Sequence, residues 1–256
     1  MTHPLKDAII QALIDQKEIF GDDLFGQIPT TDRQNQDKRK TIVVTDHPVN
    51  IGEPVEETSL FEEPKEDWEK STSLGELNGL IKDCTKCPLH KSRNKFVFGV
   101  GNPSADVLVI GEGPGAEEDK QGEPFVGRAG KLLNEILKAI KFKREEVYIA
   151  NIVKCRPPGN RTPLIEEMDE CFPYLNKQIE LIKPKLILAL GLTAAQGLLK
   201  KRDSLSNMRG NVYDFKGIRT MVTYHPAALL RNPQWKRGCW EDVQKFRKMY
   251  DELIQI

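Results

Sequence analysis

The sequence predicts an α/β fold, a three-layer α/β/α sandwich around a four-stranded parallel sheet. From residue 74 onward, short apolar runs rich in β-branched residues alternate with longer segments of helical periodicity. The apolar runs are nearly continuous, which is typical of strands buried on both faces of a parallel sheet. Segments marked by glycine or proline follow each run, so we expect a ligand site beyond the carboxyl ends of the strands.

The predicted elements follow one another in a regular order. Four segments are expected to be strands, namely DVLVIG (106–111), VYIANIV (147–153), KLILALG (185–191) and RTMVTY (219–224). Helical periodicity is present at 129–141, 165–182, 193–201 and 239–254. Together they predict one catalytic domain over residues 74–256.

Residues 1–73 are expected to form an N-terminal extension. Apolar residues at near-helical spacing predict a short amphipathic helix over 5–20. The stretch from about residue 26 to 73 is polar, acidic and dotted with proline, which predicts a mostly disordered linker.

The net charge of zero hides an asymmetry. Residues 1–70 contain 8 Lys and Arg against 16 Asp and Glu, whereas residues 71–256 contain 30 against 22. A basic body suits a polyanionic partner, although charge alone is explained equally well by ordinary solvated surface. No apolar run approaches the length of a membrane span, and the first twenty residues do not resemble a cleaved signal. We therefore expect a cytosolic or nucleoid protein without membrane contact.

Four separate segments converge on the predicted rim of the sheet. They are GEGPG (111–115), Asn151 with KCRPPGNRTP (154–163), GLTAA (191–195) and YHPAALLRNP (224–233). A carboxylate, an amide and an imidazole are among their side chains, so a shared active site is the better interpretation. A dinucleotide-binding loop is disfavoured, because the third glycine that would open a helix is missing.

Five cysteines include a C-x-x-C pair, Cys84 and Cys87. In a reducing compartment such a pair indicates a metal or redox site more often than a disulfide. Cys155 and Cys171 could complete a set of four, with fifteen residues between them. Zinc is the metal that four cysteines bind most often, but zinc sites usually use two closely spaced cysteine pairs. Cys239 is expected to be a buried helix cysteine.

Three motifs resemble one known family. GEGPG-x3-DKQGEPFVGRAG, NIVKCRPPGNRTP and HPAALL occur in the order found in the family 4 uracil-DNA glycosylases, a branch of the uracil-DNA glycosylase superfamily. The resemblance covers roughly residues 74–254. It implies a base excision repair enzyme that flips uracil out of DNA, hydrolyses the N-glycosidic bond and leaves an abasic site. It also implies a structural [4Fe–4S] cluster on Cys84, Cys87, Cys155 and Cys171.

The resemblance assigns roles to three side chains on the rim. Asn151 corresponds to the specificity residue, since an amide can donate to uracil O4 and accept from N3–H, the reverse of what cytosine requires. Phe125 corresponds to the aromatic residue on which the flipped base stacks. His225 corresponds to the catalytic histidine, whose N–H would stabilise negative charge on uracil O2 as the bond breaks.

The loop after the first strand is expected to contribute Glu112, Gly113 and Pro114 to the uracil pocket. Glu112 is the candidate for positioning water or stabilising the cationic sugar, with Glu118 and Asp119 as weaker candidates. In the best-studied branch of the superfamily the equivalent aspartate lies one position later, where this chain has Gly113.

Contacts to DNA are expected from the same rim. Leu229 and Leu230 could fill the gap left by the extruded base, and Arg231 could hold a flanking phosphate. A basic rim that tracks phosphates is predicted from Lys120, Arg128, Lys131, Lys154, Arg156, Arg161, Arg209 and Arg231.

Two other functions remain open at this stage. A relative that retains the base covalently would carry a histidine-bearing basic insertion after the second strand, and none is present in KCRPPGNRTP. A non-catalytic nucleic-acid-binding module would use its four cysteines only structurally. In the main interpretation the enzyme is monofunctional and monomeric. Its N-terminal tail either docks a repair or replication partner, weakens non-specific DNA binding or is an inert extension, three roles that the sequence does not distinguish.

Overall fold

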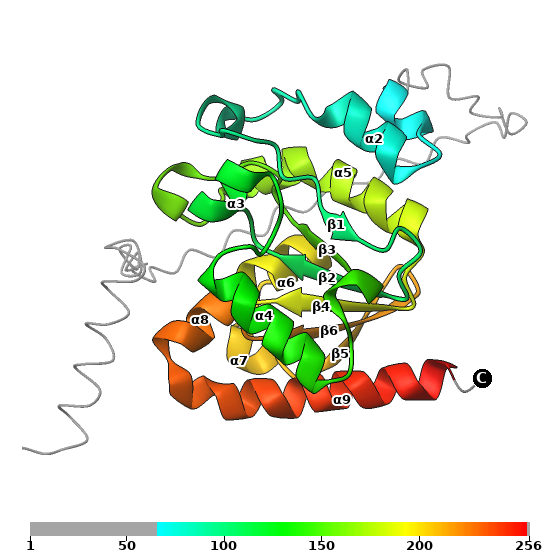
Figure 1. The fold of residues 1–256 in the computed structure, drawn as a ribbon, viewed down its shortest axis with the longest axis vertical. Helices are drawn as coiled ribbons and strands as arrows, with labels where there is room; N and C mark the ends of the chain where they lie inside the picture. The colour runs from blue at the N-terminus through cyan, green and yellow to red at the C-terminus, as the bar shows by residue number, and fades with distance from the viewer. Residues whose placement is uncertain (1–65, 255–256) are drawn as a thin grey trace, which may run out of the picture. The chain divides into compact units, whose positions relative to one another are not determined.

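The computed structural model describes residues 66–254, shown in colour in Figure 1. The predicted helix over 5–20 and most of the acidic linker lie outside the described residues. The chain is already packed ahead of residue 74, since Trp68 makes an edge-to-face contact with Tyr174 at 4.9 Å. Trp68 lies in the short 3-10 helix η2 (Asp67–Lys70), which precedes α2 (Leu74–Ile81) and η3 (Pro88–Lys91).

One mixed sheet of six strands forms the centre, in the order β1-β3-β2-β4-β6-β5. The four inner strands run parallel and coincide with the four predicted segments: β2 (Val107–Gly111), β3 (Tyr148–Asn151), β4 (Leu186–Leu190) and β6 (Ile218–Thr223). The α/β prediction is confirmed. The sheet prediction is correct only for the inner strands, because β1 (Val100–Gly101) and β5 (Val212–Phe215) add an antiparallel strand at each edge.

Helices cover both faces of the sheet, because strands β2, β3 and β4 are apolar on both sides and fully buried. On one face, alternate strand residues such as Leu108 and Ile110 pack with α2, α5 (Ile165–Ile182) and α6 (Leu192–Leu199). On the other, Val107 and Val109 pack with α4 (Arg128–Ala139) and α9 (Lys236–Ile254). Figure 1 shows α5 on one side of the strands and α4 and α9 on the other.

The four predicted helical segments correspond to α4, α5, α6 and α9. Short elements in the connections were not predicted: α3 (Ala116–Gln121), η4 (Arg144–Glu146), η5 (Pro158–Asn160), α7 (Leu205–Met208), α8 (Pro226–Arg231) and η6 (Pro233–Trp235). No helix within residues 66–254 is long and apolar enough to cross a membrane.

Candidate active site

The carboxyl ends of the inner strands bring the predicted site segments to one rim. Gly111 at the end of β2 is in register with Asn151 at the end of β3, so the glycine-rich loop starts beside the amide. On the other side, β6 leads directly into His225, which begins α8. Parallel strand order therefore gathers residues more than 100 positions apart in the sequence.

Gly111 leaves room for the side chains that surround it. A Cβ at this position would lie 2.7 Å from the Phe125 ring and closer still to Asn151 Oδ1. The Phe125 ring and the Asn151 amide therefore flank the same stretch of backbone. Any side chain at position 111 would displace them.

Phe125 is held in an unusual backbone conformation. Its φ of 54° is left-handed, a region that a bulky residue occupies only when its surroundings enforce it. Gly130 in α4 allows the backbone of Phe125 to pass so closely that a Cβ there would overlap its carbonyl. The Arg144 guanidinium also donates to the Pro124 carbonyl at 2.6 Å. Neither support was predicted, since Arg144 has no signal in the sequence.

The Asn151 side chain is buried, and within the described residues its Oδ1 has no hydrogen-bond partner. A buried acceptor without a partner is rare, because its desolvation costs about 1–3 kcal/mol. Such a group at the edge of a glycine-lined rim is an acceptor available to a ligand with an N–H donor.

The His225 imidazole lies next to Phe125, with ring centroids 5.5 Å apart and planes inclined by 33°. Its Nδ1 accepts the backbone N–H of Ala227 at 3.1 Å and so caps α8. Burial, with a smaller contribution from Arg231, lowers the pKa of His225 to about 4. The ring is therefore neutral at pH 7, and since Nδ1 accepts, the proton resides on Nε2.

Gly191 allows a close backbone approach to His225. Gly191 follows β4 with φ of +86°, and a Cβ there would lie 2.9 Å from the His225 Cβ. A glycine at this position therefore lets the backbone after β4 pass close to His225.

Glu112 is the carboxylate of the rim. Burial raises the pKa of its side chain, while a hydrogen bond from Thr193 and the charge of Arg231 act in the opposite direction. Thr193 was not singled out from the sequence, although it belongs to the GLTAA segment. A desolvated carboxylate that retains a hydrogen-bond partner is a suitable base or cation stabiliser.

The two weaker carboxylate candidates are already engaged. Glu118 Oε1 accepts the backbone N–H groups of Val126 and Gly127, both at 3.0 Å. Asp119 is fully buried and accepts from Asn94 and Lys95. Both order the loops around Phe125, so Glu112 is the carboxylate left for a ligand.

The remaining loop residues lie against the segment that follows β3. A Cβ at Gly113 would lie 2.7 Å from the Val153 methyl group, and Pro114 is buried. The loop GEGPG is therefore packed at its base, with Glu112 partly accessible.

The predicted DNA-contacting residues differ in their accessibility. Leu229 is buried in the core, whereas Leu230 is 37% exposed, so Leu230 is the one of the pair that a partner can reach. Arg128 and Arg231 are exposed. Arg161 is exposed as well, but its guanidinium forms two hydrogen bonds with the Glu167 carboxylate, at 2.8 and 2.6 Å.

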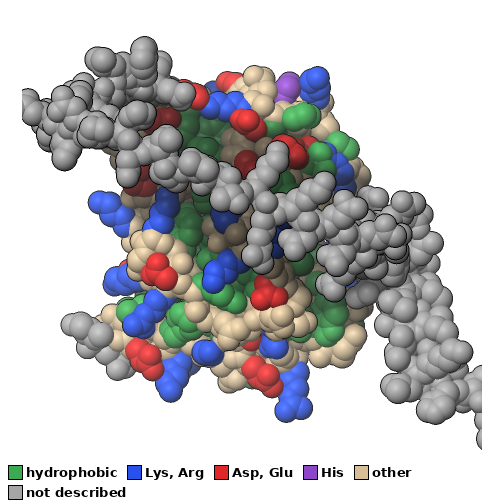
Figure 2. Space-filling model, turned by 180° about the vertical axis from the view of Figure 1, so that it is seen from behind, with side chains coloured by type: hydrophobic (Ala, Val, Ile, Leu, Met, Phe, Trp, Pro, Cys, Tyr) green, Lys and Arg blue, Asp and Glu red, His purple; other side chains and the backbone are tan. Residues whose placement is uncertain are grey.

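The structure corrects the prediction of phosphate contacts for two residues of the basic rim, Lys154 and Arg209. Lys154 is completely buried, and its ammonium donates to the Asn151 carbonyl at 2.9 Å and to Gln178 at 2.6 Å. It braces the end of β3 from behind and cannot reach a phosphate. Arg209 is held by two hydrogen bonds to Asp242. On the face shown in Figure 2, Lys and Arg side chains are interspersed with Asp and Glu.

Four cysteines line one pocket between the N-terminal segment and the body. Cys84, Cys87, Cys155 and Cys171 share it with Phe96, Tyr174 and others. Three of the sulfurs accept hydrogen bonds: Cys84 from Tyr174 at 3.3 Å, Cys155 from Arg93 at 3.1 Å and Cys171 from the Lys154 backbone at 3.3 Å. We call this site the cysteine pocket.

The donor set of the cysteine pocket fits an iron–sulfur cluster. Four thiols surrounded by N–H and O–H donors match the ligands and sulfur hydrogen bonds of such clusters. Within residues 66–254, however, no group of three or more His, Cys, Asp or Glu side chains is arranged so that it could hold a metal ion. Cys239 is buried in α9, as predicted, outside this pocket.

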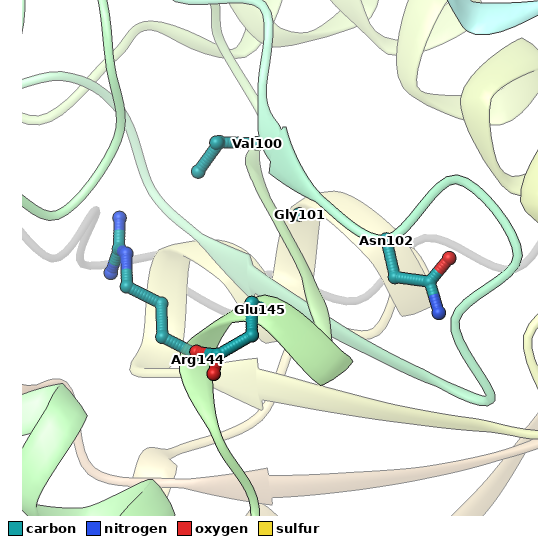
Figure 3. A pocket seen from close by; sticks show the side chains of 5 residues that line it. All are labelled: Val100, Gly101, Asn102, Arg144 and Glu145. Atoms are coloured by element: carbon teal, nitrogen blue, oxygen red, sulfur yellow. The ribbon is translucent and has the colours of Figure 1, made fainter.

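A further surface pocket lies away from the rim. Val100, Gly101 and Asn102 of the β1 edge line it together with Arg144 and Glu145 of η4 (Figure 3). Gly101 is in register with Tyr148, at the amino end of β3, whereas the predicted site residues lie beyond the carboxyl end. The chemistry-bearing residues therefore do not line this pocket.

The sequence of this chain is similar to that of known proteins. Residues 98–252 match the family model described as the uracil DNA glycosylase superfamily. Over 185 residues, the chain is 43% identical to the type-4 uracil-DNA glycosylase of Archaeoglobus fulgidus, covering 69% of this chain and 93% of that protein. It is 48% identical over 169 residues to the type-4 uracil-DNA glycosylase of Thermotoga maritima, covering 64% of this chain and 88% of that protein.

Proposed function

We propose that this chain, which belongs to the uracil-DNA glycosylase superfamily and to its type-4 branch, removes uracil from DNA at the rim of the sheet. The reaction releases free uracil and leaves an abasic site, as the first step of base excision repair. Since the base must leave its stack to reach a site at the carboxyl ends of the strands, uracil is flipped out while it is still attached to its strand.

The unpartnered Asn151 Oδ1 is the observation that best supports uracil as the base. Asn151 Oδ1 can accept a hydrogen bond from uracil N3–H, and the amide N–H₂ can donate one to uracil O4. Cytosine offers an acceptor at N3 and a donor at N4, so both contacts would be mismatched. Each mismatch leaves a buried polar group unsatisfied at a cost of about 1–3 kcal/mol.

Phe125 supplies the apolar surface for the base. Its ring lies beside both Gly111 and His225, so a planar base that stacks on it would have Asn151 at its edge. Stacking of a base on an aromatic ring is worth about 1–3 kcal/mol.

His225 acts on the leaving group in this proposal. Breaking the glycosidic bond leaves negative charge on uracil O2, and a neutral imidazole with its proton on Nε2 donates to that atom. The cap to Ala227 fixes the ring orientation beforehand, so the donor needs no reorganisation during the reaction.

Glu112 acts on the sugar side. Its carboxylate orients the attacking water or stabilises the positive character of the sugar as the bond lengthens. Burial raises the pKa of Glu112, and Thr193 and the positive charge of Arg231 oppose that rise.

The cysteine pocket would hold a [4Fe–4S] cluster on Cys84, Cys87, Cys155 and Cys171. The cluster would supply covalent cross-links between residues 84–87, the segment after β3 and helix α5, with no part in bond cleavage. Hydrogen bonds from Tyr174, Arg93 and the Lys154 backbone would stabilise the thiolates.

One assay tests the function and separates the alternatives. Purified protein is incubated with a uracil-containing oligonucleotide, and the products are analysed with and without alkali. We expect free uracil and a strand that breaks only after alkali. A stable protein–DNA adduct would favour a relative that retains the base covalently. Intact DNA that is bound equally with or without uracil would favour a non-catalytic binding module.

A further inference from the structure

An exposed tryptophan lies close in sequence to the catalytic histidine. Trp235 is 38% exposed in η6, the turn that follows α8 and precedes α9. Its ring is stacked on Tyr224, with centroids 5.2 Å apart and planes inclined by 19°. Tyr224 is the residue directly before His225, so this stack is attached to the end of β6 from which the active site is built.

The Tyr224 ring of this stack is held by further contacts. The Arg209 guanidinium lies 4.9 Å from the Tyr224 ring centre, and Arg209 is itself fixed by Asp242 and by the Gly238 carbonyl at 2.6 Å. Asp242 in turn accepts from Thr223 at 2.8 Å, within β6. A large aromatic surface that is held in place and partly exposed loses little conformational freedom when a flat ligand stacks on it.

The surroundings favour an anionic strand as the ligand. Arg231, Lys236 and Arg237 are exposed within six residues of Trp235, with Glu241 paired to Arg237 across one helical turn. Helix α8 also packs against α4, whose first turn carries exposed Arg128 and Lys131. Exposed Leu230 lies between His225 and Trp235 in the chain. Aromatic rings among cations are the usual platform for single-stranded nucleic acid.

We propose that Trp235 stacks with a nucleobase that flanks the uracil in the same DNA strand. The proposal rests on the function proposed above, because it requires uracil in the rim pocket while the neighbouring strand crosses α8 and η6. Binding energy from this base holds the strand while uracil is out of the stack, and it does not depend on the flanking base identity, since every base has a flat face.

The test compares three variants on one set of substrates. Trp235→Ala removes the platform, Trp235→Phe keeps an aromatic ring, and Trp240→Ala is the matched control. Trp240 is 43% exposed on the neighbouring helix and is not part of the Tyr224 stack. Substrates are single-stranded oligonucleotides with one uracil, in which each flanking nucleotide in turn is replaced by a baseless tetrahydrofuran spacer.

We expect Trp235→Ala to raise KM about tenfold on the complete strand, with Trp235→Phe and Trp240→Ala close to wild type. One spacer position should raise the wild-type KM by the same factor and leave the KM of Trp235→Ala unchanged. That position identifies the stacked base. An unchanged KM in Trp235→Ala, or a loss that no spacer position reproduces, would overturn the platform. Melting temperatures of the variants must match for the comparison to hold.

Failure of the proposed function gives a different result. If the wild-type protein releases no uracil from any strand, the glycosylase assignment fails. The platform is then read from tryptophan fluorescence, where DNA should quench wild-type emission more than that of Trp235→Phe. Equal quenching in both would dismiss the platform independently of catalysis.

Discussion

The rim and the cysteine pocket hold their residues in different ways. At the rim, strand ends fix the backbone, and glycines at 111, 130 and 191 let side chains approach to contact distance. At the cysteine pocket, residues 84–97 meet the body through the hydrogen bond of Arg93 to the Cys155 sulfur, the buried side chain of Leu89, and hydrogen bonds of Asn94 and Lys95 to Asp119. The rim is supported by the sheet core, whereas the N-terminal segment would gain further cross-links from the cluster proposed for the cysteine pocket.

The difference predicts a separation of effects. Substitutions at the rim should abolish uracil excision while the fold persists. Substitutions at the cysteine pocket should lower the folding stability more than they lower the excision rate. Lys154 joins the two, since its ammonium reaches Asn151 and its backbone N–H reaches Cys171.

Asn151→Asp should reduce uracil excision by about 10⁴-fold, because a carboxylate offers uracil O4 an acceptor where a donor is needed. Weak excision of cytosine is expected, since the acid accepts from cytosine N4. Single-turnover rates at pH 8 keep the carboxylate ionised, and Asn176→Asp on α5 is the matched control. Unchanged uracil excision would remove Asn151 from the site.

His225→Ala should lower the single-turnover rate by about 10²–10³-fold, since one preorganised donor to the leaving anion is lost. Affinity for uracil-containing DNA should persist, because the proposed site assigns base recognition to Asn151 and Phe125. The substitution also removes the cap of α8, at a cost of about 1 kcal/mol, which a melting curve measures separately. Full activity in this variant would contradict the role given to the imidazole.

The inner sheet and the rim could be predicted from the sequence because both leave strong local signals. Nearly continuous apolar runs give β2, β3, β4 and β6, and their order brings Asn151 and His225 to one rim of the sheet. The edge strands β1 and β5 were missed, since two to four partly exposed residues carry no periodicity.

Tertiary contacts account for the rest of what the sequence did not reveal. Lys154 resembles any surface lysine in the sequence, and only the fold places Gln178 opposite its ammonium. The same holds for Arg144, which supports the loop before Phe125 through one carbonyl. The positive φ of Phe125 likewise depends on Gly130 in the following helix.

Cys171→Ser should abolish the iron content and brown colour of anaerobically purified protein and lower its melting temperature, because cluster binding contributes folding free energy. Cys239→Ser is the control and should leave iron and colour intact, since Cys239 lies in α9 outside the pocket. Residual uracil excision at low temperature is expected if the rim is independent. Stoichiometric zinc in colourless wild-type protein would reverse the metal assignment.

The dependence of folding stability and of the single-turnover rate on pH should show that His225 is neutral near pH 7. Its pKa of about 4 lies below the usual 6.5, so the unfolded chain binds the proton first as pH falls. This contribution to stability is complete above pH 6.5 and is lost on acidification toward pH 4. The single-turnover rate should lack a step near pH 6.5. Arg231→Gln removes a nearby positive charge and should move the acid limb to higher pH, and an unmoved limb would mean that Arg231 does not act on His225.

The smallest effect is expected outside both regions, from removal of residues 1–65. This segment carries 7 Lys and Arg against 13 Asp and Glu, while the rest of the chain is basic. The cut is placed before Trp68 so that its contact with Tyr174 beside the cysteine pocket is kept. Deletion should leave the excision rate unchanged and tighten non-specific DNA binding severalfold at low salt, because six net negative charges are removed from a chain that binds phosphates. Salt near 0.15 M should reduce the difference, since the Debye length is then about 8 Å. Equal affinities of the full-length and truncated proteins at low ionic strength would mean that these charges do not compete for the DNA-binding face.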